Sequence, residues 1–137
     1  AGETAFLTTV RTETYNTFTR IVFEFDDATP EYRIEYLDGE PLASPSGNPL
    51  DIEGNAFLAI TMAPAAGVDL SGDEPVVTYE GPDRISIEAD DITELVKSED
   101  FEATLGWVVG LESEQPFSFT TLDDPHRLVI DIEVDVS

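Results

Sequence analysis

The sequence contains no cysteine, which excludes disulfide bonds, thiolate metal sites, iron–sulfur clusters and a cysteine nucleophile. It is also poor in cations, because six Lys and Arg side chains stand against 30 Asp and Glu side chains, for a formal net charge of −24. So few cations cannot form a basic stripe that neutralises phosphates, which excludes nucleic acid as a partner. No run approaches the roughly 20 apolar residues that a membrane-spanning helix needs.

The chain has 137 residues, of which 41% are hydrophobic and 9% aromatic, as in one ordinary globular domain. We therefore expect a single monomeric domain over residues 1–137, with its core over about residues 6–133. The acidic surplus is interpreted mainly as a means of solvating a salt-tolerant surface. One alternative interpretation is that the acids form dedicated Ca²⁺ sites. Another is that the acidic surface attracts a protein partner.

Alternating apolar and polar residues dominate the sequence. In residues 17–26, Ile21, Phe23 and Phe25 fall on one face of a strand, and Arg20 and Glu24 fall on the other. Similar alternation recurs over residues 6–11, 32–37, 57–62, 76–80, 84–88, 106–111, 116–122 and 127–136, with turn-forming residues between these segments. This pattern predicts an all-β, antiparallel β-sandwich of two small sheets with about nine or ten strands.

Residues 91–97 are the weakest assignment, since their apolar spacing also permits one short helix. We favour a strand or an irregular connection there, because the flanking segments are plainly β. The fold is thus expected to contain at most one short helix.

Two segments far apart in the chain share one pattern of arginine, aliphatic, valine, apolar, acidic and apolar residues. They are residues 20–25 and residues 127–132. If the two segments pair as antiparallel neighbours, Arg20 meets Asp131 and Arg127 meets Glu24 on one polar face. We predict this pairing.

The aromatic side chains are the candidates for sugar stacking, namely Tyr15, Tyr32, Tyr36, Tyr79 and Trp107. Tyr32 and Tyr36 point the same way as Ile34 along one strand, so a core position is the competing interpretation. Trp107 lies within Gly-Trp-Val-Val-Gly-Leu, a setting typical of a core residue.

Catalysis and metal binding find weak support in the sequence. His126 is the one histidine, and no Gly-x-Ser-x-Gly elbow accompanies it. The acids Glu99, Asp100 and Glu102 beside Phe101 allow a glycosidase pair, and the loops that hold Asp26 and Asp27 or Asp69, Ser71, Asp73 and Glu74 allow Ca²⁺. Solvated turns explain these residues better, so we expect no enzyme, no cofactor and no bound metal.

Several short segments, taken in order, resemble one known family. They are residues 15–25, Pro30-Glu31-Tyr32 with Tyr36, Ala56-Phe57-Leu58 with Pro64-Ala65, Asp100-Phe101-Glu102-Ala103 leading to Trp107-Val108-Val109-Gly110-Leu111, and Asp124-Pro125-His126-Arg127-Leu128-Val129-Ile130-Asp131. Together they resemble the AMIN-like domain of actinobacterial envelope lipoproteins, a relative of the AMIN domain of cell-wall amidases and secretins. The resemblance covers about residues 6–133.

This resemblance implies an all-β, exported protein of the cell envelope or a secreted one, often held by a lipid anchor upstream. The opening residues Ala1-Gly2-Glu3-Thr4, without an initiator Met, fit a chain that follows a removed export segment. The AMIN relatives resemble modules that target peptidoglycan. We therefore expect a non-catalytic domain that binds peptidoglycan or another cell-wall glycan, with an envelope protein as the alternative partner. The expected ligand-binding residues are Tyr15, Arg20, Tyr32, Tyr36 and Arg127.

Overall fold

The computed structural model describes residues 4–26, 28–43, 46–87, 89 and 91–133. The described chain is all-β and contains no helix, and residues 92–101 form a strand as favoured above. The strands are β1 (Ala5–Thr14), β2 (Phe18–Asp26), β3 (Glu31–Tyr36), β4 (Ala56–Ala63), β5 (Ala65–Ala66), β6 (Val68–Asp69), β7 (Val76–Val77), β8 (Arg84–Ser86), β9 (Ile92–Phe101), β10 (Thr104–Leu111), β11 (Phe117–Leu122) and β12 (His126–Glu133).

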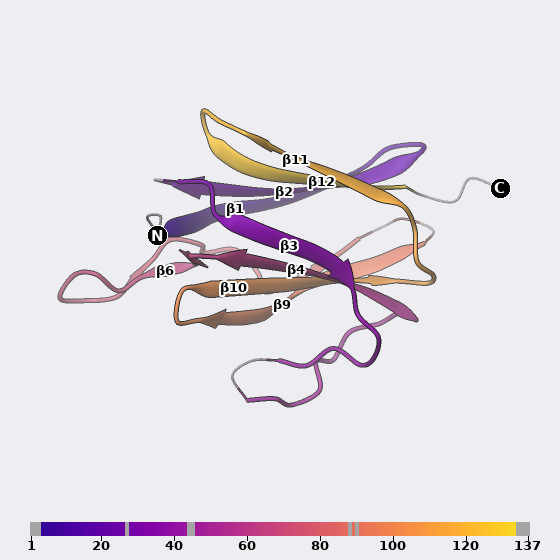
Figure 1. Ribbon diagram of the computed structural model, residues 1–137, viewed down its shortest axis with the longest axis horizontal. Helices are drawn as coiled ribbons and strands as arrows, with labels where there is room; N and C mark the ends of the chain where they lie inside the picture. Colours follow the sequence, from indigo (N-terminus) through magenta and orange to yellow (C-terminus); the bar gives the residue numbers. More distant parts are fainter. Residues whose placement is uncertain (1–3, 27, 44–45, 88, 90, 134–137) are drawn as a thin grey trace.

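Two five-stranded sheets lie face to face (Figure 1). Sheet A has the strand order β11-β12-β2-β1-β5, and sheet B has the order β3-β4-β10-β9-β8. A separate pair, β6-β7, lies beside them. The predicted β-sandwich is confirmed. Its strands pair antiparallel except for β1 and the two-residue β5, which run parallel.

The strand boundaries differ from the predicted ones where the alternation was short. The segment expected at residues 76–80 forms only the two-residue β7, and the one at 84–88 ends at Ser86. β5 and β6 have two residues each, too few to show any periodicity in the sequence. Residue 88 and residues 134–136, which the predicted strands included, lie outside the described residues.

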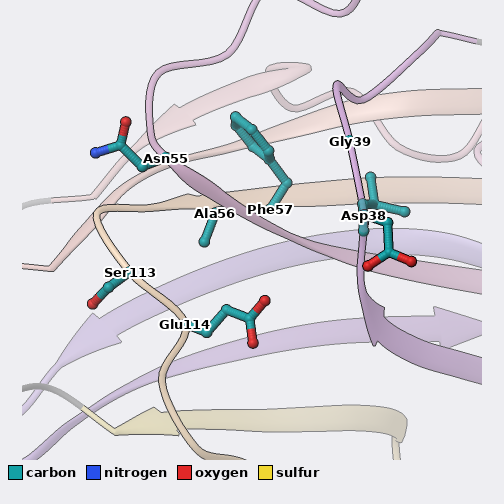
Figure 2. Close-up of a pocket in the computed structure, with 8 residues that line it drawn as sticks. Asp38, Gly39, Asn55, Ala56, Phe57, Ser113 and Glu114 are labelled. Atoms are coloured by element: carbon teal, nitrogen blue, oxygen red, sulfur yellow. The ribbon is translucent and has the colours of Figure 1, made fainter.

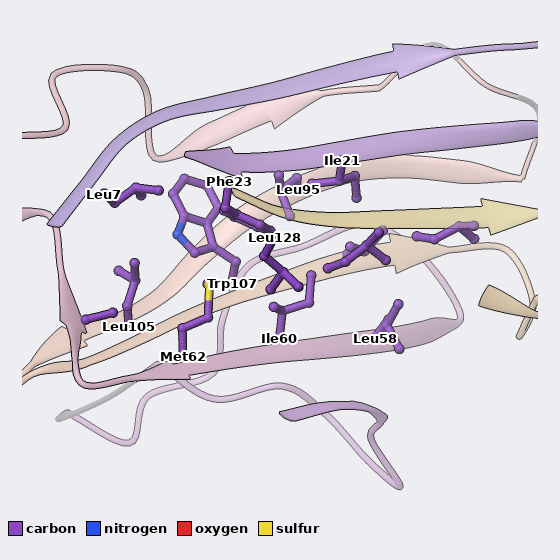
Figure 3. Packing of buried hydrophobic residues seen from close by; sticks show 14 of the residues in the cluster. Leu7, Ile21, Phe23, Leu58, Ile60, Met62, Leu95, Leu105, Trp107 and Leu128 are labelled. Atoms are coloured by element: carbon purple, nitrogen blue, oxygen red, sulfur yellow. The ribbon is translucent and has the colours of Figure 1, made fainter. Parts of the chain in front are cut away.

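The core fills the space between the sheets and centres on Trp107, which is 0% exposed (Figure 3). The indole ring lies 5.9 Å from the Phe23 ring of sheet A and 5.8 Å from the Tyr79 ring, which meets it edge-on. The core position of Trp107 is thereby confirmed. Tyr79 is also buried and its hydroxyl donates to the Pro82 carbonyl at 2.6 Å, so it offers no surface for stacking.

A buried carboxylate holds a long loop against the outer surface of sheet B. Glu94 accepts the Arg84 Nη1 donor at 2.8 Å and the backbone N–H of Glu53 at 2.8 Å. Arg84 also donates from Nη2 to the Asp51 carbonyl at 2.6 Å. These bonds satisfy the nearly buried Glu94 and bring residues 51–53 over β10, where Gly110 leaves room for them.

Gly110→Ala tests how tightly this loop packs. The added methyl group would overlap the Glu53 carbonyl oxygen and lie 2.6 Å from Thr93 Oγ1, so we expect a loss of about 1–3 kcal/mol of unfolding free energy. Gly39→Ala is the control, since nothing lies within 4 Å of its added Cβ. Urea denaturation of both variants measures the difference. Equal stabilities would contradict the packing described here.

Candidate functional site

The solvent-facing side of sheet A gathers charged residues of both signs. Its inward positions, such as Ile21, Phe23 and Phe25, belong to the core, so the alternate positions point to solvent. The outer face of sheet A, as we call it, carries these charged residues on β1, β2 and β12: Arg11, Glu13, Arg20, Glu24, Asp26, Arg127, Asp131 and Glu133. Half of the six Lys and Arg side chains of the chain therefore lie on this one face.

The predicted pairing of the two similar segments is confirmed. β12 runs antiparallel to β2, with Asp131 opposite Arg20 and Arg127 opposite Glu24. Arg20 binds Asp131 through two hydrogen bonds, from Nε to Oδ1 at 2.9 Å and from Nη2 to Oδ2 at 3.1 Å. Two parallel bonds of this kind fix the guanidinium in both position and orientation.

The second predicted contact is wrong, because a third strand competes for the carboxylate. Glu24 accepts Arg11 Nη2 of β1 at 2.7 Å rather than Arg127. Arg127 instead donates from Nε to the Pro125 carbonyl at 3.2 Å. Among the described residues, Arg127 is the one Lys or Arg side chain without an ion pair.

Two aromatic rings and Arg20 form a compact cluster at the β1–β2 turn. The rings of Tyr15 and Phe18 are stacked, with centroids 4.7 Å apart and planes inclined by 24°. The Arg20 guanidinium carbon lies 5.8 Å from the Tyr15 centroid and 5.4 Å from the Phe18 centroid. Both distances are within the range of cation–π attraction. Tyr15 remains 42% exposed, so this cluster presents an aromatic surface to solvent.

Hydrogen bonds set the ionisation states in this cluster. The Tyr15 hydroxyl donates to the Glu13 carboxylate, which raises the pKa of Tyr15 above its ordinary value. The Asp131 carboxylate accepts from Arg20 and raises the pKa of the guanidinium. Tyr15 is therefore neutral and Arg20 charged at physiological pH.

A shallow cleft adjoins the cluster. Its volume is about 290 Å³, and its lining consists of Thr17, Phe18, Phe117, Ser118, Asp131 and Glu133. Phe18 is shared between the cluster and the cleft, so the aromatic surface continues into a concave space that offers hydroxyls and carboxylates. An aromatic wall with a few polar groups is the general composition of a small-molecule site.

Tyr32 and Tyr36 lie elsewhere, where one edge of the sandwich closes. The Tyr36 ring meets Phe117 edge-on at 5.8 Å, and the Tyr32 ring meets Phe119 edge-on at 5.5 Å. The Tyr36 hydroxyl donates to the Gln115 carbonyl and accepts the Gln115 N–H at 2.8 Å. We call Tyr32, Tyr36, Phe117 and Phe119 the aromatic seam. The five expected ligand residues are thus split between the outer face of sheet A and this seam.

A larger open pocket of about 470 Å³ lies where the loops after β3, before β4 and after β10 meet (Figure 2). Its polar lining includes Asp38, Asn55, Ser113 and Glu114. Asp38 and Glu114 enter it from separate loops (Figure 2). The lining of this pocket and that of the cleft beside Phe18 each contain two carboxylates and no cation. The cleft differs because the Tyr15–Phe18–Arg20 cluster adjoins it.

The residues considered for catalysis and metal binding have ordinary structural contacts. His126 Nδ1 lies 3.0 Å from Thr29 Oγ1 and 3.3 Å from Asp123 Oδ1. Asp69 accepts the N–H and hydroxyl of Ser71, which lowers the pKa of the Asp69 carboxyl. Within the described residues, no three His, Cys, Asp or Glu side chains are grouped to hold a metal ion, and Asp27 lies outside them. The same residues contain no helix long and apolar enough to cross a membrane.

The model of the AMIN-like domain family matches residues 5–134, nearly the whole chain. The chain belongs to the AMIN-like domain family. As an AMIN-like domain it is related to the AMIN modules that bind cell walls, and domains of this family are typically non-catalytic. Searches of curated proteins and of solved structures found no match.

Phe18 is the residue of the candidate site that sequence reasoning missed. It has the same parity as Arg20 in β2, so the alternation already placed it on the polar face. An aromatic residue on a polar face next to a turn was the available signal. The sequence could not show that Phe18 lines the cleft, since Phe117 and Ser118 come from a strand about 100 residues later.

The burial of Tyr36 predicts an alkaline effect on stability. Burial raises the pKa of Tyr36, so the folded state holds the phenol proton more tightly than the unfolded state does. This contribution to stability is complete below the unfolded pKa of about 10 and is lost as the pH rises through the folded pKa. Tyr36→Phe should cost about 1–2 kcal/mol near pH 7 and should lessen the loss of stability between pH 9 and 11.

Denaturation at several pH values checks this effect, with Tyr32→Phe as the control that keeps Tyr36 intact. If Tyr36→Phe and the unmodified domain lost the same stability between pH 9 and 11, Tyr36 would not be the titrating group.

Proposed function

We propose that this AMIN-like domain is a non-catalytic module of the cell envelope that binds peptidoglycan or another cell-wall glycan through the outer face of sheet A. The observation that carries the proposal is the exposed Tyr15–Phe18 stack, held by Arg20 beside a cleft. Family membership supports wall binding as the general role, and it favours a location outside the cytoplasmic membrane.

The cluster has the composition that recognition of a sugar requires. The C–H face of a pyranose ring packs on an aromatic ring, while its hydroxyls need donors and acceptors at the margin. Tyr15 and Phe18 supply the aromatic surface, and Arg20, Ser118 and Asp131 supply polar groups around it. Because Asp131 holds Arg20 in place, little side-chain freedom is lost when a ligand binds.

A cation without an ion pair among the described residues favours the same face. Cell-wall polymers often carry negative charge, which the surface of this acidic protein would generally repel. The outer face of sheet A holds Arg11, Arg20 and Arg127, and Arg127 has no ion pair among the described residues. Arg127 is therefore proposed to meet an anionic group of the glycan or of the peptides attached to it.

Sedimentation of the domain with insoluble peptidoglycan at low and high salt tests the proposal. Tyr15→Ala should weaken binding about threefold to tenfold at both salt concentrations, because the loss of an aromatic contact costs about 0.5–1.5 kcal/mol. Leu42→Ala, another exposed apolar truncation, is the control and should bind normally. Equal binding by Tyr15→Ala and Leu42→Ala would show that the glycan does not stack on Tyr15.

A matched pair of arginine variants tests the charge contribution. Arg127→Gln should weaken binding at low salt more than at high salt, because salt screens exposed charges. Arg33→Gln makes the same change of charge on β3 of sheet B and should leave binding unchanged. If both variants weakened binding equally, net charge rather than this face would govern retention. A domain that did not sediment at either salt concentration would contradict glycan binding altogether.

A further inference from the structure

β11, one of the two outer strands of sheet A, differs from the other outer strands of the two sheets because it is both long and uncharged. Its sequence, Phe-Ser-Phe-Thr-Thr-Leu over Phe117–Leu122, has no charged residue, although 26% of the chain is charged. The outer strand β3 carries Glu31, Arg33 and Glu35, while β5 and β8 have only two and three residues. Charge and shortness are the usual protection of a sheet edge against pairing with another chain, and β11 has neither.

The backbone of β11 presents unpaired groups at this edge. The Pro116 carbonyl accepts the Glu133 N–H at 2.9 Å, so this pair is a hydrogen-bonded one. Such pairs recur at every second residue of an antiparallel ladder, so the backbone N–H and C=O groups of Ser118 point toward β12. Those of the residues on either side of Ser118 point away from β12. The N–H and C=O groups of Phe117, Phe119 and Thr121 therefore point to the free edge.

The core side of β11 is incompletely covered. Phe119 lies opposite the buried Ile130, so its ring is on the core side of sheet A, yet it is 50% exposed. Tyr32 covers one edge of that ring, and Thr121, which also lies on the core side, is exposed. A strand added beside β11 would place alternate side chains over this exposed part of the aromatic seam.

The charges at both ends of β11 indicate the chemistry of that strand. Asp123 and Asp124 follow β11, and Glu112 and Glu114 precede it. A second copy paired antiparallel through β11 would set the aspartates of each copy against the glutamates of the other. A six-residue edge also offers far less contact than the roughly 800 Å² per partner of a stable dimer. These acids favour a partner with cationic ends.

We propose that the free edge of β11 binds an extended segment of another protein, which joins sheet A as a sixth strand. The segment has an uncharged centre rich in β-branched or aromatic residues and carries Lys or Arg at its ends. Backbone bonds to Phe117, Phe119 and Thr121 supply binding energy, and the seam and the terminal acids select the sequence. This interaction does not depend on glycan binding by Tyr15 and Arg20.

A peptide with a blocked N-terminus and an amide C-terminus, Lys-Lys-Thr-Val-Thr-Val-Thr-Val-Lys-Lys, serves as the probe in fluorescence anisotropy with the intact domain. Thr121→Pro removes an N–H that points to the free edge and leaves the β12 ladder intact, so it should weaken peptide binding at least tenfold. Thr121→Val keeps that N–H and should bind as the unmodified domain does. The same peptide with Glu in place of Lys should bind at least tenfold more weakly.

Amide hydrogen exchange provides a second readout that needs no variant. The peptide should slow the exchange of the Phe119 and Thr121 amides and leave that of the Arg33 amide on β3 unchanged. Thermal unfolding of Thr121→Pro checks that the fold is kept, and retention of that variant on peptidoglycan keeps this test separate from the glycan proposal. If the fold is lost, Thr121→Lys replaces it and should also weaken binding of the cationic peptide.

Three results would overturn the proposal. Equal affinity of Thr121→Pro and Thr121→Val for the peptide would place the peptide elsewhere on the domain. Equal affinity for the Lys and Glu peptides would show that the acids at the ends of β11 do not select the peptide. Concentration-dependent dimerisation that Thr121→Pro abolishes, seen by sedimentation without peptide, would make a second copy the occupant of the edge.

Discussion

Trp107 fills the gap between the two sheets at the centre of β10, and the separation of the layers depends on it. Packed sheets lie about 10 Å apart, and one indole ring spans much of that distance. Its Nε1 has no hydrogen-bond partner among the described residues, a cost of about 1–3 kcal/mol. Burial of roughly 150–250 Å² contributes about 4–6 kcal/mol, so packing outweighs the unpaired donor.

Closure of the two sandwich edges follows from this central contact. Tyr79 meets the indole edge-on at one side, and the aromatic seam closes the other side. Tyr32, Tyr36 and Tyr79, which were candidates for ligand binding, form the ring contacts that close these edges. Tyr36 has both sides of its hydroxyl engaged by Gln115, whereas Tyr15 lies outside the sandwich with its ring exposed. On the outer face of sheet A, the exposed aromatic surface therefore lies at the β1–β2 turn, whereas the exposed Phe119 lies on the core side.

The few cations are distributed in a way that separates folding from binding. Arg84 and Lys97 join β8, β9 and neighbouring loops on sheet B, where Glu94 and Asp100 are largely buried and Asp83 is exposed. Arg33 Nη1 lies 3.8 Å from Glu35 Oε1 and both side chains are exposed, so this ion pair contributes little to stability. The remaining three arginines lie on the outer face of sheet A, and Arg127 is the one of them without an ion pair among the described residues.

The sequence predicted this face from local pattern, and its errors came from contacts between distant segments. The shared motif of residues 20–25 and 127–132 correctly predicted their pairing and the contact of Arg20 with Asp131. It could not include β1, whose Arg11 reaches Glu24 from a diagonal position and displaces Arg127. Alternation correctly put Tyr32 and Tyr36 beside Ile34, but their partners on β11 follow about 80 residues later and share no pattern with them.

The proposed glycan site and the proposed edge for a partner strand share one wall. Phe117 and Ser118 line the cleft beside Phe18 and also begin β11, so a strand added at this edge would end next to the cleft. If the partner protein is itself attached to the wall polymer, binding of either ligand raises the local concentration of the other at the adjoining surface. Such an effect requires no conformational change in the domain. An acidic domain with one long uncharged edge strand is thus suited to hold a protein segment close to the wall polymer, while the acids around that strand oppose pairing between copies.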